Sequence, residues 1–132
     1  MQNGEREGVI KSVKKILIVD DEKMIQQVFS DFFNHAGYEV TVASNGVECG
    51  LQLFEHEFDV ILMDMMMPEM SGDKAIRYIK NSFSEKIRSM KIIIISSFIN
   101  DEIREEFGQY KNIYFFEKPV KLLEVMKVIE ER

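Results

Sequence analysis

Short apolar runs alternate along this chain with longer segments in which apolar residues recur at helical spacing. Most of the runs are rich in β-branched residues and have no polar face, which is typical of strands buried on both sides of a sheet. They cover residues 15–19, 38–43, 60–63, 92–95 and 113–116. Because a segment long enough for a helix separates each run from the next, the pattern predicts strands joined by crossovers.

The segments between these runs predict five helices. The first covers about residues 22–36 and ends at Gly37. The second follows Asn45-Gly46, and we expect Val47, Leu51 and Phe54 to form its packing face. The others are expected at about residues 71–83, 101–109 and 122–132, with residues 84–91 as a long charged connection.

The third predicted helix is marked by Ala75, Ile76 and Ile79. Ile103 and Phe107 are the only strong anchors of the fourth, and the fifth is expected to pack through Leu123, Met126, Val128 and Ile129.

An alternating chain of this kind predicts an α/β fold, with a doubly wound five-stranded parallel sheet and helices on both faces, because crossovers are right-handed. At 132 residues and 45% hydrophobic content, one domain over residues 15–132 is expected. Residues 1–14 are polar and show no convincing period, so we expect a mobile leader there.

Charge and amino-acid composition argue against several classes of function. The net charge of −6 argues against direct binding of nucleic acid, which needs clustered Lys and Arg. Cys49 is the only cysteine, so no intramolecular disulfide can form, and we expect it to be a small helix filler. No apolar stretch is long enough to span a membrane, and a cytoplasmic location is expected.

Polar groups follow four of the predicted strands. Asp20-Asp21, Asp64, Ser96-Ser97 and Lys118 come directly after them. In parallel strands of one sheet these groups converge at the carboxyl edge, where open α/β sheets bind ligands. Taken alone, Asp64 could equally be a turn former and Lys118 a solvated surface residue.

The three carboxylates at positions 20, 21 and 64 would repel one another, so a site that keeps them ionised needs a cation. Magnesium fits, because it takes oxygen ligands and commonly binds through carboxylates together with a phosphate. The sequence offers no Cys/His set for zinc.

The set formed by Asp20-Asp21, Asp64 with the following Met-Met-Met-Pro-Glu-Met-Ser-Gly, Ser96-Ser97 and Lys118-Pro119 resembles a response-regulator receiver domain of two-component signal transduction. The resemblance to this chemotaxis-regulator-like family runs from about Lys15 to the C-terminus. It implies the flavodoxin-like strand order 2-1-3-4-5, which periodicity alone would not fix.

The resemblance also implies a reaction: transfer of a phosphoryl group from a phosphohistidine of a sensor histidine kinase or histidine phosphotransfer protein to Asp64. In the family pattern Asp21 and Asp64 ligate Mg²⁺ directly, Asp20 acts through a bound water, and the backbone carbonyl of Met66 completes the protein ligands. Lys118, followed by the family's cis-proline, would neutralise charge on the phosphoryl group.

Ser96 matches the family's switch hydroxyl, and Phe115 matches its switch aromatic, although Phe115 could simply be a core residue. Phosphorylation would then reshape the surface of the fourth helix, fifth strand and fifth helix, where an unknown downstream protein binds.

Met66 and Phe98 flank the approach of water in the family geometry. Because both are bulky and apolar, they predict slow self-dephosphorylation. We expect the protein to catalyse its own phosphorylation from phosphodonors and this slow reverse step, and not to act as a conventional enzyme.

Other functions fit the residues less well. A receiver-like interaction module that works without phosphorylation would lack an acid, the hydroxyl or the lysine, and all are present. A flavin carrier needs a phosphate loop where this chain has Asp-Asp-Glu-Lys. An aspartyl phosphatase needs a second acid where Met66 stands. His35 and His56 fall near helix ends at the opposite edge of the sheet, and we expect them to be surface residues.

Overall fold

The computed structural model describes residues 13–64, 74, 77, 80, 81, 84–97, 99 and 101–131. Its five strands form one parallel sheet in the order β2-β1-β3-β4-β5, which confirms the predicted fold class and strand order. The strands are β1 (Lys15–Val19), β2 (Glu39–Ala43), β3 (Val60–Asp64), β4 (Lys91–Ser96) and β5 (Ile113–Glu117). Each predicted strand is therefore correct to within one residue at either end.

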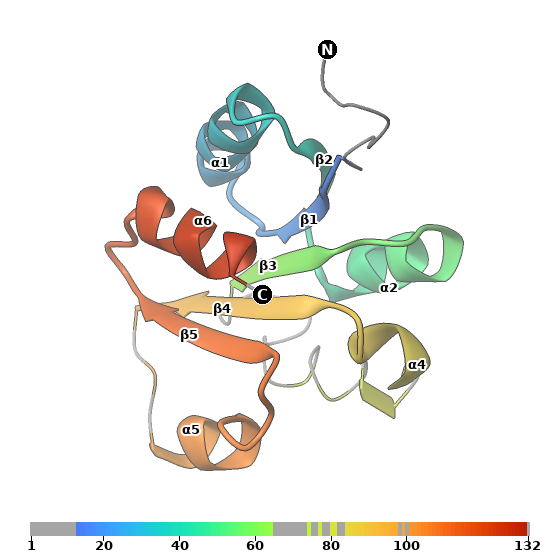
Figure 1. Ribbon diagram of the computed structural model, residues 1–132, viewed down its shortest axis with the longest axis vertical. Coiled ribbons are helices and arrows are strands. Elements are labelled where there is room, and N and C mark those ends of the chain that lie inside the picture. The colour runs from blue at the N-terminus through green and yellow to red at the C-terminus, as the bar shows by residue number, and fades with distance from the viewer. Residues whose placement is uncertain are drawn as a thin grey trace, which may run out of the picture.

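Side chains alternate between the two faces of the sheet, so each strand contributes to two cores. On one face Ile16, Ile18 and Leu62 pack with residues of α1 (Lys23–His35) and α6 (Leu122–Glu130). On the other face Leu17 and Ile61 pack with residues of α2 (Gly46–Glu55) and α5 (Asp101–Phe107). Figure 1 shows this arrangement, with α1 and α6 on one side of the sheet and α2 and α5 on the other.

Four of the predicted helices are confirmed as α1, α2, α5 and α6. The third lies mostly outside the described residues, although Lys74, Arg77, Lys80 and Asn81 are helical. Residues 84–91, expected to be a long charged connection, begin with the helical turn α4 (Ser84–Ile87). In this turn Lys86 donates to the carbonyl oxygens of Leu53 and His56 at the end of α2, which ties the turn to its neighbour.

The packing face expected for α2 is wrong. Val47, Leu51 and Phe54 are 59%, 59% and 77% exposed. The helix instead buries Gly46, Cys49, Gly50 and Leu53. The buried face of α2 consists mostly of small residues. The prediction followed the largest apolar side chains, and these lie on the exposed face.

Smaller differences concern the other helices. In α6, Ile129 is buried and Met126 and Val128 are partly buried as expected, but Leu123 is 67% exposed and Val125 packs in its place. Helix α1 ends at His35, and Gly37 just beyond it has a φ of +96°, the left-handed conformation that glycine adopts after helix C-termini. Within the part of the chain that the structure describes, none of the helices is both long and apolar enough to cross a membrane.

Candidate functional site

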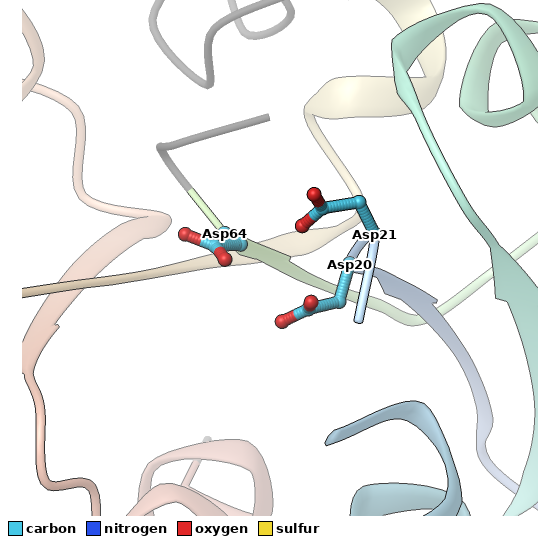
Figure 2. A group of neighbouring side chains, drawn as sticks. All are labelled: Asp20, Asp21 and Asp64. Atoms are coloured by element: carbon cyan, nitrogen blue, oxygen red, sulfur yellow. The ribbon is translucent and has the colours of Figure 1, made fainter. Parts of the chain in front are cut away.

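Three carboxylates gather where β1 and β3 end. Asp64 is the last residue of β3, and Asp20 and Asp21 follow β1 directly. Because β1 and β3 are neighbours with Val19 paired to Met63, the next residues of the two strands meet at the same edge. One carboxylate oxygen from each residue lies within 4.8 Å of the others, and Figure 2 shows the three side chains gathered at this edge.

Lys118 joins this group from β5. Its ammonium nitrogen lies 3.4 Å from Oδ2 of Asp64, and the side chain is 31% exposed. Its backbone N–H donates to the carbonyl oxygen of Ser96 at 2.8 Å, which fixes the chain just after the two strands. The Lys118–Pro119 peptide bond is cis, as the resemblance implied.

Ser96 is the last residue of β4 and is buried. It lies on the strand between those that carry Asp64 and Lys118, and it pairs with Glu117. Phe115 is partly buried against the core beneath α2 and α5, with the guanidinium carbon of Arg104 5.8 Å from its ring centroid. Its predicted core contacts and its predicted switch position are thus compatible.

The electrostatics of the site reflect the crowding of acids. Asp20 is almost fully buried, and burial raises its pKa from 3.8 to about 6, with the charges of Asp64 and Asp21 adding to the rise. A hydrogen bond from the backbone N–H of Glu22 to Oδ1 of Asp20 and the charge of Lys118 act in the opposite direction. All the side-chain donors of this site are carboxylate oxygens, and Lys118 compensates only part of their negative charge. Such a site fits a hard divalent cation such as Mg²⁺.

One supporting residue was not foreseen from the sequence. Gln26 is buried on α1, and its side-chain nitrogen donates to the backbone carbonyl of Asp20 at 2.5 Å and to the hydroxyl of Ser44 at 3.1 Å. It therefore connects the segment after β1 with the segment after β2. The sequence feature that could have indicated this role is a polar residue next to the apolar positions Met24, Ile25 and Val28 of the first predicted helix.

Other residues singled out from the sequence fall as follows. His35 ends α1 and His56 follows α2, and both are exposed, as expected. Cys49 is buried and its pKa is raised to about 12 by burial, which agrees with a structural role. Met66 and Phe98 lie outside the described residues.

Comparison with known proteins agrees with this geometry. The response regulator receiver domain family model matches residues 16–130. The polar-differentiation response regulator DivK of Brucella anthropi is 27% identical over 117 residues, which cover 89% of this chain and 94% of DivK.

Solved structures of similar fold include the chemotaxis protein CheY4 of Vibrio cholerae, with a TM-score of 0.79, 26% identity and coverage of 89% of this chain and 99% of that one. The receiver domain of the Francisella response regulator 1452 matches with a TM-score of 0.76, 26% identity and coverage of 88% and 93%. With the family model spanning nearly the whole described sheet and its helices, this chain belongs to the response regulator receiver domain family.

Proposed function

We propose that this receiver domain is a phosphorylation-controlled signalling switch in which Asp64 accepts a phosphoryl group from a phosphohistidine of a sensor histidine kinase or histidine phosphotransfer protein. The observation that carries the proposal is the convergence of three carboxylates and the Lys118 ammonium at the carboxyl edge of the sheet. Few other chemistries need a carboxylate nucleophile, oxygen ligands for a cation and a fixed positive charge within this distance.

The step forms one bond and breaks another. A carboxylate oxygen of Asp64 bonds to phosphorus while the phosphorus–nitrogen bond of the phosphohistidine breaks, and the departing imidazole nitrogen keeps the electron pair and takes up a proton. Asp64 is held by its strand, so little freedom is lost when it attacks. The ammonium nitrogen of Lys118 lies 3.4 Å from Oδ2 of Asp64, where it can balance the charge on the transferred group.

Asp20, Asp21 and Asp64 would hold Mg²⁺, with the backbone carbonyl of Met66 as a further ligand implied by the family. When bound, the ion neutralises charge on the phosphoryl oxygens. The buried hydroxyl of Ser96 would then bind a phosphoryl oxygen, and Phe115 would carry the change to the surface of α5, β5 and α6. Slow self-dephosphorylation, based on the side chains at positions 66 and 98, and a cytoplasmic location stay predictions.

The test is phosphorylation of the full chain by acetyl phosphate with Mg²⁺, followed by mass spectrometry of the intact protein. We expect the mass of one added phosphate in the wild type, and no added phosphate in Asp64→Asn. The matched control is Asp59→Asn, which removes an aspartate before β3 and should leave the mass shift unchanged. An unmodified wild type would favour the alternative of an interaction module that works without phosphorylation, and a persisting shift in Asp64→Asn would place the acceptor elsewhere.

A further inference from the structure

Helix α2 presents three large apolar side chains to solvent. Val47, Leu51 and Phe54 follow the spacing i, i+4, i+7, so they lie in one line along the helix, which we call the α2 stripe. The three side chains expose on the order of 350 Å² together, the size of patch that is often functional on a monomer.

Folding of this domain does not account for the α2 stripe. The core under α2 is filled by Cys49 and Leu53 from the other side of the helix, and both are essentially inaccessible. Isolated exposed apolar residues are ordinary, but an aligned set on one short helix leaves a continuous surface that gains free energy when it is covered.

Charge around the stripe restricts what can cover it. Helix α2 contains no Lys or Arg, and the ammonium group of Lys86 at its C-terminal end contacts the carbonyl oxygens of Leu53 and His56 and the carboxylate of Glu57. Glu48 and Glu55 are exposed, and they lie three residues before and four residues after Leu51, which places both beside the stripe. An anionic membrane surface would be repelled by these carboxylates, and a second copy of α2 would bring the same acids together across the contact.

We propose that the α2 stripe is a docking surface for an amphipathic helix of a partner protein, with an apolar ridge flanked by Lys and Arg. The i, i+4, i+7 spacing suits a helix because two helices pack through such lines of side chains. Basic residues beside the ridge would face Glu55 and also Glu48, one of whose carboxylate oxygens accepts from the backbone N–H of Ser44 at 2.7 Å. Helix α2 contributes no residue to the acidic cluster, so this docking does not require phosphorylation of Asp64 and does not rest on the proposed function.

The experiment uses two synthetic helical peptides of about 20 residues, long enough to form a helix. Both carry the same leucine ridge, flanked by Lys in one and by Glu in the other. Each is titrated into the isotope-labelled full chain while backbone amide shifts are followed. We expect the Lys-flanked peptide to shift amides of residues 46–55 and to bind at least tenfold more tightly than the Glu-flanked peptide.

Variants separate the apolar and charged contributions. Phe54→Ser and Leu51→Ser should each weaken the Lys-flanked peptide at least tenfold, and Leu123→Ser on α6, an equally exposed leucine, should leave its affinity unchanged. Glu55→Lys should weaken the Lys-flanked peptide and strengthen the Glu-flanked one. All four positions are exposed, so the thermal unfolding curve should change little.

Several results would overturn the proposal. Equal binding of both peptides would mean that the stripe binds apolar surfaces without regard to charge. Amide shifts centred on residues 20, 21 and 64 would mean that the lysines bind the acidic cluster instead. No binding of either peptide would exclude a helix of this kind. A dimer seen by sedimentation and lost in Phe54→Ser would identify a second copy as the occupant, and anionic vesicle binding lost in Phe54→Ser would identify a membrane.

Discussion

Asp20 is an almost fully buried carboxyl group, and its pKa is raised from 3.8 to about 6. Burial is the largest cause of its raised pKa, ahead of the neighbouring charges of Asp64 and Asp21. The folded protein therefore binds a proton here between about pH 4 and pH 6, where the unfolded chain has released it. The contribution of Asp20 to stability is greatest below pH 4 and is lost as the pH rises through 6.

Substitution Asp20→Asn should remove this dependence on pH. At pH 7.5 without divalent metal, we expect the variant to have a free energy of unfolding about 1–3 kcal/mol above that of the wild type, because position 20 no longer holds a buried charge. The amide oxygen can still accept from the backbone N–H of Glu22. The check is urea unfolding with chelator at pH 4.5 and pH 7.5, where the gain should be much smaller at the lower pH.

The exposed Asp31 provides the control for that comparison, since Asp31→Asn also removes one negative charge from the chain. It should leave the difference between the two pH values unchanged. An Asp20→Asn variant that gained no stability at pH 7.5 would show that neighbouring groups already compensate the buried carboxylate.

Among elements, the C-terminal end of α6 is stabilised by lysines from distant segments. The ammonium group of Lys91, at the start of β4, donates to the carbonyl oxygens of Val128 and Ile129 at 2.6 and 3.2 Å, and Lys14 reaches the same Ile129 oxygen at 3.1 Å. These carbonyl groups belong to the last turn of α6, where the Val128 oxygen also accepts from the backbone N–H of Glu131 at 3.3 Å, and a positive charge there favours the helix dipole. Burial lowers the pKa of Lys91, with the charge of Lys14 acting in the same direction.

Replacing Lys91→Met keeps the apolar stem and removes the charged donor. We expect a loss of about 1–3 kcal/mol in the free energy of unfolding, because the carbonyl groups at the end of α6 lose a charged hydrogen-bond partner. Denaturant unfolding at pH 7 provides the measurement. The control is Lys127→Met, an exposed lysine of the same helix, and equal losses in the two variants would contradict the capping role.

The elements also indicate where sequence reasoning succeeds. Strands such as β1 and β3 were predicted closely because, apart from Lys15 at the start of β1 and Asp64 at the end of β3, every position is apolar and buried. Helix α2 was located correctly, since Asn45 caps it by accepting from the backbone N–H of Glu48. Its orientation was wrong because a helix can bury small residues and expose large ones, and only the packed structure distinguishes the two.

For the molecule as a whole, the candidate site was easier to predict than individual packing faces. Once the strands are parallel, the residues that follow them must meet at one edge, and this brought Asp20, Asp64 and Lys118 together as expected. Gln26 was missed because its two partners belong to segments after different strands, and a helical pattern does not indicate which polar residue points inward.

The proposed switch depends on communication between this edge and the surface formed by α5, β5 and α6. Arg104 of α5 lies over the ring of Phe115, so the arginine and the ring are in contact in the unmodified protein. A movement of Phe115 inward, away from Arg104, would weaken this cation–π contact, which is worth about 0.5–1 kcal/mol at an exposed position. The contact therefore favours the arrangement seen here.

Arg104→Gln should weaken that preference while keeping a side chain of similar length. From the energy of the contact, we expect the population of the alternative Phe115 arrangement in the unphosphorylated protein to rise about two- to fivefold. Fluorine NMR with fluorinated phenylalanine assigned at position 115 measures this population, and beryllofluoride with Mg²⁺ marks the signal of the activated form. Arg88→Gln, an exposed arginine before β4, is the control and should leave the population unchanged. If Arg104→Gln leaves it unchanged as well, the contact does not restrain the ring, and the observed arrangement must be set by the core on which Phe115 packs.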